Sequence, residues 1–314
     1  MNVLVTGAGG KLGRRLLPAL VKAGHSARAL QFRTPVACNG VETATGSVSD
    51  ARAVRQALQG MEAVCHLATS KEDAGFIDTS IKGTFNLLEG CRENGIRQFI
   101  LASGDAALGI FFNPQPVPLD ENAPLKAYPG YYAFSKVMEE TMCRQYALQY
   151  GLPVTVLRFS WIQDEDDLLC HMTFDEPDFG FPNWRDITGI PYPAGAGILL
   201  HPDSRPYKRH IVGVDDAVRS FLLALGNPAA LGETFNIAAS APFSYDVLAA
   251  YVAQKLDLPV FEVVFPDYHD FTIDIGKART VLGYQPQDDA FRIINKAIDF
   301  RRSSGVRASV RYGG

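Results

Sequence analysis

Two side chains that could exchange a proton, Tyr132 and Lys136, stand four positions apart in the sequence. The segment around them has the periodicity of a helix, and residues i and i+4 share one helix face, so the phenol and the ammonium can meet at one site. A neighbouring ammonium favours the phenolate and lowers the pKa of a tyrosine. Such a tyrosine can take a proton from an alcohol oxygen or return one to a ketone oxygen. Taken alone, the pair also fits an exposed, solvated helix face.

Three glycines, Gly7, Gly10 and Gly13, lie between a β-branched run at 2–6 and a stretch of helical periodicity at 11–23. A helix N-terminus presents unpaired N–H groups and a positive dipole end, and glycines there let a pyrophosphate approach the backbone. Their place at the first strand-to-helix turn predicts a dinucleotide site, and a positive nicotinamide would lower the pKa of Tyr132 further. The alternative is a turn with only a structural role.

The elements that would position these residues alternate along the chain. Apolar runs with strand character lie at 26–30, 63–67, 98–102 and 154–159, and helical periodicity lies at 51–58, 76–94 and 131–150. Strands that alternate with helices form right-handed crossovers and a parallel sheet covered on both faces. We therefore expect an α/β fold, a Rossmann-type doubly wound sheet with its ligand at the carboxyl ends of the strands.

The pattern changes after the strand at 154–159. Between 160 and 209 prolines, glycines, aromatic residues and acids crowd together with little periodicity, which predicts an irregular segment. Helical periodicity returns at 215–225 and 245–256, with a short strand at 234–237. We expect residues 1–159 to form a dinucleotide-binding domain to which 210–240 return. Residues 160–209 and 241–314 would form a small C-terminal substrate-binding cap.

Composition argues against several other classes of protein. Of the 314 residues 47% are hydrophobic and 20% are charged, and the net charge of −4 lacks the basic field that nucleic acids and anionic membranes require. No apolar run approaches the ~18 residues of a membrane span. The five cysteines have neither paired nor metal-ligand spacing, which predicts free thiols, no metal and a cytoplasmic location. The acids at 164–167 lack the pattern of a calcium loop and are expected to form a solvated turn.

Together, the glycine run and the Tyr132/Lys136 pair resemble the extended short-chain dehydrogenase/reductase family, in its NAD-dependent epimerase/dehydratase branch. The resemblance extends over nearly the whole chain, through 66–69, 83–89, 157–158, 214–217, 234–237 and 277–286. It implies that Tyr132 is the catalytic acid/base and that Lys136 also holds the nicotinamide ribose. It further implies a small-molecule substrate and a homodimer built on the helices at 76–94 and 131–150.

The resemblance also implies which residues bind NAD or NADP. They lie in the glycine loop, after the strand at 26–30, before the helix at 51–58, at the end of the strand at 63–67, and at the catalytic lysine: Gly7, Gly10, Lys11, Leu12, Gly13, Gln31, Arg33, Ser47, Val48, Leu67, Ala68, Thr69 and Lys136. His66 is expected either to contact the cofactor or to be a hydrogen-bonded strand-end residue. Asp50 is expected to cap a helix rather than to bind adenine.

The end of the second strand bears on the choice of cofactor. An acidic residue there would bind the ribose hydroxyls of NAD, but this chain has Gln31, with Arg33 close behind. A neutral residue with an arginine fits a 2′-phosphate and favours NADP, although Arg33 also fits an ordinary solvated loop charge.

The chain departs from the family where a serine or threonine usually bonds the substrate oxygen, because that position falls on Gly104. The neighbouring Ser103 could act in its place, and Asp105 could contact substrate or donate a proton, or either could be structural. Arg209 stands where family members often contact a substrate phosphate. Arg209 and Arg158 are candidates for binding an anionic substrate group by charge-assisted hydrogen bonds.

These observations support three functions. The first is an NAD(P)-dependent epimerase/dehydratase-type oxidoreductase that acts at a secondary alcohol or ketone of a sugar-like, anionic small molecule. The second is a simple dehydrogenase of a sugar acid or aldose with an exchangeable cofactor, favoured by the missing hydroxyl at Gly104. The third is a non-catalytic dinucleotide-binding sensor or interaction protein, which the presence of Tyr132 and Lys136 argues against.

Overall fold

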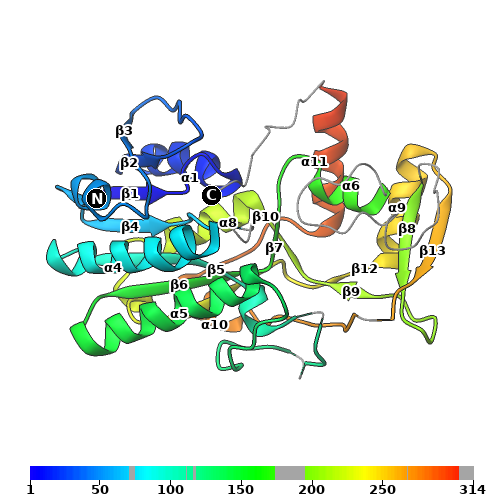
Figure 1. The fold of residues 1–314 in the computed structure, drawn as a ribbon. Helices are drawn as coiled ribbons and strands as arrows, with labels where there is room; N and C mark the ends of the chain where they lie inside the picture. Colours follow the sequence, from blue (N-terminus) through cyan, green and yellow to red (C-terminus); the bar gives the residue numbers. More distant parts are fainter. Residues whose placement is uncertain (71–74, 111, 116–117, 174–194, 267, 304–314) are drawn as a thin grey trace.

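A computed structural model describes residues 1–70, 75–110, 112–115, 118–173, 195–266 and 268–303. Its main feature is a seven-stranded sheet in the order β11-β6-β5-β4-β1-β2-β3, in which every pairing is parallel (Figure 1). The strand order reverses between β1 and β4, so the sheet is doubly wound, as expected. The strands are β1 (Asn2–Thr6), β2 (Ser26–Gln31), β3 (Val41–Thr45), β4 (Ala63–His66), β5 (Gln98–Gly104), β6 (Val154–Phe159) and β11 (Thr234–Ile237).

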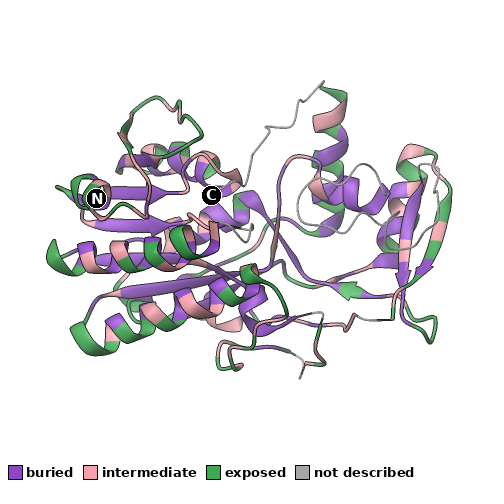
Figure 2. Ribbon diagram, in the orientation of Figure 1, coloured by how far each residue is buried: buried purple, intermediate pink, exposed green. Residues whose placement is uncertain are grey.

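Helices cover both faces of this sheet because successive strand residues point to opposite sides. Along β1, Val3 and Val5 pack into one buried cluster with α1 and α8, whereas Leu4 packs into another with α2, α4 and α5. Most of the sheet is buried, whereas the covering helices are exposed along part of their surface (Figure 2). The covering helices are α1 (Lys11–Lys22), α2 (Ala51–Leu58), α4 (Gly83–Glu93), α5 (Tyr131–Tyr150) and α8 (Val214–Ala224). A π-helical segment, η1 (Phe76–Lys82), leads into α4.

A second, smaller group of elements lies to the right in Figure 1 and has its own hydrophobic cluster. It contains α6 (Asp167–Thr173), α9 (Tyr245–Leu256), α11 (Ala290–Arg302) and the parallel pair β8 (Ala196–Leu200) and β13 (Val260–Val264). Two short pairs, β7 (Trp161–Gln163) with β10 (Ile211–Gly213) and β9 (Lys208–Arg209) with β12 (Phe243–Ser244), lie between this group and the large sheet. The remaining elements are η2 (Asp105–Leu108), η3 (Pro228–Ala230) and α10 (Gly276–Leu282).

The segment 160–209 is more regular than expected. Its described residues contain β7, α6, β8 and β9, and each of these elements is two to seven residues long, too short for a periodic sequence signal. The acids at 164–167 also do not form a solvated turn. Asp164 is 2% exposed and pairs with Arg14 and Arg15 of α1, and Asp167 pairs with Lys11. The acidic run therefore ties the smaller group of elements to the first helix of the sheet.

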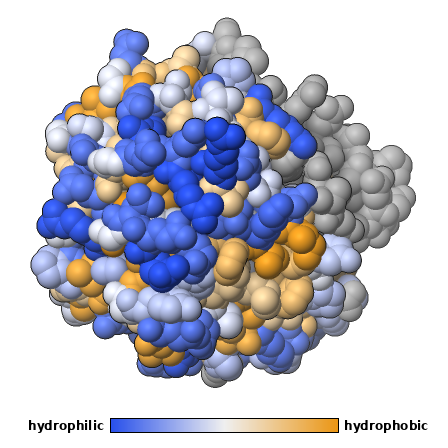
Figure 3. All heavy atoms as spheres, turned by 60° about the vertical axis from the view of Figure 1, so that its left-hand side comes forward, coloured by the Kyte–Doolittle hydropathy of each residue, from blue (hydrophilic) through white to orange (hydrophobic). Residues whose placement is uncertain are grey.

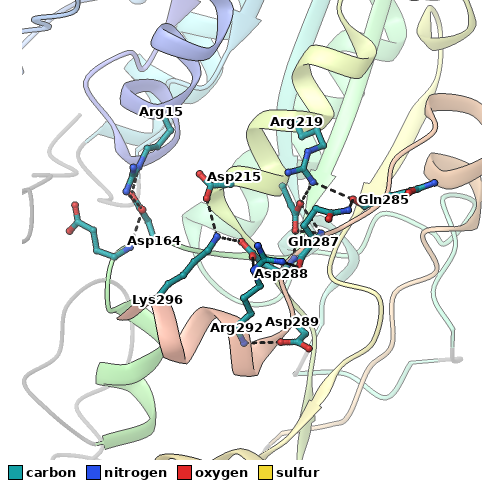
Figure 4. Close-up of polar contacts among 12 residues, drawn as sticks. Arg15, Asp164, Asp215, Arg219, Gln285, Gln287, Asp288, Asp289, Arg292 and Lys296 are labelled. Carbon is teal, nitrogen blue, oxygen red and sulfur yellow. Dashed lines mark hydrogen bonds and ion pairs between the residues drawn. The ribbon is translucent and has the colours of Figure 1, made fainter. Parts of the chain in front are cut away.

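A second polar joint connects α8 with α11. The ammonium of Lys296 on α11 lies between Asp215 of α8 and Asp288, at 3.1 and 2.6 Å (Figure 4). The carboxylate of Asp216 accepts the backbone N–H groups of Gln287 and Asp288. These contacts fix the start of α11 against the sheet.

Three sequence expectations about single features can be compared directly. Asp50 caps α2 by accepting the N–H groups of Arg52 and Ala53, which confirms the capping role. The five cysteines are free thiols. None of the helices that the structure describes is long and apolar enough to cross a bilayer.

Candidate functional site

The turn between β1 and α1 forms a glycine cradle, in which two of the glycine positions leave no room for a side chain. Gly7 has a φ of +64°, and a Cβ atom there would lie 2.6 Å from the backbone N of Ala68. A Cβ on Gly13 would lie 2.5 Å from the carbonyl oxygen of Gly7. The helix begins at Lys11, and its N-cap, Gly10, has no side chain that could bond the first N–H groups. These N–H groups fit a pyrophosphate, so the loop fits the group that its spacing predicts.

Two adjoining cavities extend from this loop along the carboxyl ends of the strands. They share Gly7, Gly10, Leu67 and Thr69 in their linings. The smaller, of about 140 Å³, extends past the ends of β2 and β3 to Gln31, Arg33, Ser47 and Val48, with Ala68 on its wall. The larger, of about 510 Å³, contains Lys11, Leu12, Gly13 and Lys136. Every residue that the family resemblance assigns to the dinucleotide therefore lines one of the two cavities.

The end of β2 is polar but carries no carboxylate. Gln31 accepts the backbone N–H of Val36 through Oε1, and its Nε2 donates to Thr45 Oγ1 at 3.3 Å, so both ends of its amide are bonded. The guanidinium of Arg33 lies 5.2 Å from the centroid of the exposed Phe32 ring. One cationic and one neutral side chain therefore face the place where the second ribose of a dinucleotide would lie.

Tyr132 and Lys136 both line the larger cavity from α5. The ammonium of Lys136 lies 5.7 Å from the centroid of the Tyr132 ring. It donates to the carbonyl oxygen of Ala102 at 3.1 Å and to Glu139 Oε2 at 2.9 Å. The pair thus meets at one site, as i and i+4 spacing predicts.

The electrostatics of Tyr132 differ from the expectation. In the protein alone the pKa of Tyr132 is raised, first by burial and then by the negative charges of Asp105 and Glu139. The expected lowering by Lys136 does not appear, because the ammonium is paired with the buried Glu139. A positive nicotinamide ring would act in the opposite direction, toward the phenolate.

A side chain would fit at Gly104, the position where the family usually has a hydroxyl. A Cβ on Gly104 would lie 3.7 Å from the Tyr132 hydroxyl, in ordinary contact, so a serine there would face the tyrosine. Ser103 also lines the cavity, but its hydroxyl donates to Glu140 Oε1 at 2.5 Å. Its bond therefore leads away from Tyr132 toward the pair that Glu140 makes with Arg158.

Asp105 follows Gly104 and presents a nearly buried carboxyl to the same cavity. Its Oδ2 accepts the hydroxyl of Ser160 at 3.0 Å. Burial raises the pKa of Asp105 to about 7, against the opposing effects of Ser160 and Arg209. Near neutral pH this side chain can hold or release a proton beside Tyr132.

The two candidate arginines have different surroundings. Arg209 lines the cavity, and its guanidinium stacks on Trp161 at 3.9 Å from the ring centroid. Arg158 lies outside both cavity linings. Its guanidinium donates to both carboxylate oxygens of Glu140, at 2.8 to 3.1 Å, and to the carbonyl oxygen of Glu121. The expected substrate contact of Arg158 therefore does not fit the structure, because this arginine joins α5 to β6 behind the site.

His66 is a buried, hydrogen-bonded residue. Its Nδ1 lies 2.7 Å from Thr6 Oγ1 and its Nε2 lies 3.0 Å from Thr84 Oγ1. Burial, followed by the charge of Lys136, lowers the pKa of His66 to about 3. The ring is therefore neutral and holds β1, β4 and α4 together, and only its neighbours Leu67 to Thr69 face the cavities.

Several residues that line the larger cavity are not expected from the sequence. An aromatic and aliphatic wall surrounds Asp105 and Arg209, formed by Ile110, Phe112, Tyr128, Trp161, Ile162 and Tyr268. Trp161 and Ile162 follow the end of β6, and that position alone could have indicated them. Tyr268 is more than 100 residues from Tyr132 in sequence, and no local sequence pattern predicts that it lines the cavity. Among the described residues, no cluster of three or more His, Cys, Asp or Glu side chains is arranged to hold a metal ion.

Comparison with known proteins agrees with this geometry. The family model described as "NAD dependent epimerase/dehydratase family" matches residues 3–162. The chain belongs to this family. Its glycine cradle, β1 to β6 of the sheet, and its tyrosine and lysine lie in the matched half, whereas β11 lies beyond it.

Individual relatives have different activities. A UDP-glucose 4-epimerase of Mycolicibacterium smegmatis is 27% identical over 96% of this chain and 99% of its own length. A uronate dehydrogenase of Pseudomonas syringae is 27% identical over 50% of this chain and 58% of its own length. A sterol demethylase protein B of Methylococcus capsulatus is 38% identical, but over only 37% of each chain. These relatives support an NAD-dependent oxidoreductase or epimerase without selecting its substrate.

A solved structure supports the fold over the whole chain. A short-chain dehydrogenase/reductase superfamily protein from Agrobacterium tumefaciens, with bound NAD, superposes with a TM-score of 0.85. The two chains are 26% identical, and the match covers 97% of this chain and 98% of the other. The extended short-chain dehydrogenase/reductase fold expected from the sequence is therefore confirmed.

Proposed function

We propose that this family member is an oxidoreductase of the epimerase/dehydratase type that acts at a secondary alcohol or ketone of a sugar-like, anionic small molecule. One observation carries the proposal: a single cavity of about 510 Å³ is lined by the glycine cradle, by Tyr132 with Lys136, and by Arg209. A dinucleotide site, a proton donor and a cation thus face the same space. None of these three features alone would support the proposal, because each could also have a purely structural role.

Each group of residues that lines the cavity would have a separate role in this reaction. When bound, a nicotinamide dinucleotide supplies or accepts the hydride at the substrate carbon. Tyr132 takes the proton from the hydroxyl oxygen, or returns it to the ketone oxygen. Lys136 holds the ribose and the developing phenolate, while the glycine cradle holds the pyrophosphate. The apolar wall excludes water from the reacting atoms.

Asp105 takes over the contact that a hydroxyl at position 104 would make. Its carboxyl lines the cavity beside Tyr132, and its pKa of about 7 makes it a hydrogen-bond donor as well as an acceptor near neutral pH. A carboxyl in this position favours the second candidate, a simple dehydrogenase of a sugar acid or aldose, because its charge can change between the alcohol and the ketone complex.

Arg209 supports an anionic substrate. A guanidinium that lines a largely apolar cavity can form charge-assisted bonds to a carboxylate or phosphate. Its stacking on Trp161 fixes the plane in which it presents its N–H groups. At the other end of the groove, Gln31 and Arg33 support NADP rather than NAD, because no carboxylate is present there to repel a 2′-phosphate.

We extend the proposal to the molecule as a whole. Residues 1–159 with 210–240 would bind the dinucleotide, and 160–209 with 241–314 would bind the substrate. Exposed apolar side chains on η1, α4 and α5, among them Ile77, Phe85 and Leu148, support a homodimer through these helices. The free thiols support a cytoplasmic location.

The first test is to purify the protein without added cofactor, denature it, and identify any released dinucleotide by mass and absorbance. Stoichiometric NAD supports an epimerase or dehydratase that keeps its cofactor. An empty protein that binds NADP or NAD reversibly supports the dehydrogenase, and the ratio of the two dissociation constants tests the preference for NADP.

The catalytic role is tested with Tyr132→Phe. We expect this variant to bind the dinucleotide as the wild type does and to lose at least ~100-fold in kcat, because general acid–base catalysis typically contributes that much. Retained dinucleotide binding is the internal control for folding. Unchanged activity, or a wild-type protein that binds dinucleotide without reacting with any alcohol or ketone, would favour the non-catalytic sensor.

A further inference from the structure

The catalytic lysine has a buried carboxylate partner that neither the sequence motif nor the family comparison assigns. Glu139 lies three residues beyond Lys136 on α5, and its Oε2 accepts the ammonium at 2.9 Å. Its exposed fraction is 0%, and that of the Lys136 side chain is 5%. A carboxylate at this depth is costly unless it is paired, so its presence calls for a role.

Glu139 fixes where the ammonium can point. An ammonium has three N–H donors. One donates to the Ala102 carbonyl oxygen and one to Glu139. The third remains for the cavity that Lys136 lines. The two acceptors therefore hold Nζ at the cavity wall.

Glu139 also changes the charge that Tyr132 experiences. The tyrosine is flanked by the cation of Lys136 and by two carboxyl groups, Asp105 on the cavity side and Glu139 on the buried side. Burial raises the pKa of Glu139, and the ion pair with Lys136 limits that rise. The pKa of Tyr132 is raised by both carboxyl groups in addition to burial.

Other titratable groups from the surrounding elements lie around Tyr132, Asp105 and the Lys136–Glu139 pair. They are Tyr128 before α5, His66 from β4, Arg209 from β9, and Glu140 and Cys143 on α5 itself. Burial lowers the pKa of His66 to about 3 and raises that of the Cys143 thiol, so both are neutral at pH 7. Glu140 is paired with Arg158. Asp105 and Glu139 are therefore the carboxyl groups whose charge reaches Tyr132 most directly.

We propose that Glu139 is a positioning residue for the reaction: its carboxylate fixes Lys136 and offsets the ammonium charge beside Tyr132. The inference rests on the proposed function, in which Tyr132 exchanges a proton with the substrate oxygen. Because the lysine and the glutamate together are neutral, Tyr132 enters the reaction as the phenol. Its O–H bond breaks as the new O–H bond forms on a ketone oxygen, while a reduced nicotinamide dinucleotide supplies the hydride. This arrangement keeps Tyr132 able to donate its proton to a ketone oxygen at neutral pH.

The test measures proton release when NAD⁺ binds, which requires no substrate. A positive nicotinamide favours the phenolate, so binding releases a proton from Tyr132 over a defined pH range. Calorimetry in buffers of different ionisation enthalpy gives the number of protons released at each pH. The variant Tyr132→Phe identifies the part of the release that belongs to this tyrosine.

We expect Glu139→Gln to lower the pH midpoint of this release by about one unit, because the lysine charge is no longer offset. Glu139→Asp keeps the charge but withdraws it by one methylene, so its midpoint should lie between those of Glu139→Gln and the wild type. Cys143→Ala is the matched control: it lies one turn further along α5, is equally buried, and changes packing without changing charge. Its midpoint should equal that of the wild type.

Equal midpoints in the wild type and Glu139→Gln, or an equal shift in Cys143→Ala, would overturn the inference and leave the proposed function intact. If Glu139→Gln does not fold, a wild-type midpoint in Glu139→Asp would overturn it. The inference would also be overturned if NAD⁺ binding released no proton that depends on Tyr132 between pH 6 and pH 10. A chain that binds neither NAD⁺ nor NADP⁺ would instead overturn the proposed function, and the inference with it.

Discussion

The buried carboxyl of Asp105, for which we propose a contact with substrate, also carries a cost to stability. Its pKa rises from the usual 3.8 to about 7 in the folded protein, chiefly through burial. The unfolded chain therefore loses this proton at a lower pH than the folded chain does. The stability that the protonated form contributes is complete below pH ~4 and is lost as the pH rises through about 7. Such a cost is typical of a group kept for chemistry.

We expect Asp105→Asn to be more stable than the wild type at high pH. The asparagine oxygen can still accept the hydroxyl of Ser160, but the residue cannot ionise. Its advantage in free energy of unfolding should grow by about 2 to 3 kcal/mol between pH 5 and pH 8, since one pKa unit corresponds to about 1.4 kcal/mol. Urea denaturation at pH 5, 6.5 and 8 measures it. Asp203→Asn, at an exposed acid, is the control, and an advantage independent of pH would contradict the prediction.

Spacing in the sequence predicts some site residues and leaves others out for a physical reason. Tyr132, Lys136 and the three glycines lie within one turn or one helix, so their separation along the chain determines their separation in space. Glu139 lies in the same helix, but a glutamate three residues from a lysine usually indicates an ion pair on an exposed helix face. Only the tertiary structure shows that this ion pair is buried. Tyr128 and Tyr268 reach the cavity through loops whose course depends on tertiary packing.

Among the helices and strands, those buried on the sheet are the ones that periodicity predicts well. The expected helix at 131–150 and strand at 154–159 coincide with α5 and β6, because both have long, continuous signals. The expected helix at 76–94 is π-helical over η1 and α-helical only over α4, a change that the sequence pattern does not reveal. β3 was not expected, because this edge strand is short and has no fully buried residue.

The approach of α1 to the glycine loop gives a prediction for an element. Gly13→Ala should push the helix away, because the new Cβ would lie 2.5 Å from the backbone oxygen of Gly7. We expect a loss of about 1 to 3 kcal/mol in free energy of unfolding, the usual cost of overpacking, and at least tenfold weaker dinucleotide binding. Lys22→Ala, at the exposed end of the same helix, should change stability by less than ~0.5 kcal/mol. Equal effects of the two variants would show that the close approach does not matter.

Across the whole molecule, the large sheet with its helices and the smaller group of elements are joined by polar contacts that no local pattern could predict. Lys11, Arg14 and Arg15 of α1 meet acids that lie about 150 residues later in the chain, and Figure 4 shows the Arg15 and Asp164 contact beside the Lys296 joint. The sequence favoured a solvated turn for these acids because their basic partners are distant along the chain. The described surface, in contrast, has an apolar region on the helices for which the family resemblance implies a dimer interface.

That apolar region leads to the prediction about assembly. Exposed fractions reach 60% for Ile77, 49% for Phe85 and 70% for Leu148, on neighbouring elements η1, α4 and α5. Figure 3 brings forward the side of the molecule that lies to the left in Figure 1, and on it hydrophobic side chains gather in a patch at lower right among hydrophilic neighbours. A monomer that leaves such a surface in water loses the burial it could gain from a second copy.

We expect light scattering at micromolar concentration to give twice the mass of one chain. The double variant Phe85→Glu and Leu148→Glu should give the mass of a single chain, because four charges would meet across a two-fold interface without partners. Val247→Glu is the control, since Val247 is 52% exposed but lies on α9, among the smaller group of elements. It should remain dimeric. A monomeric wild type would contradict the assembly, and a dimer that survives both glutamates would place the interface on another surface.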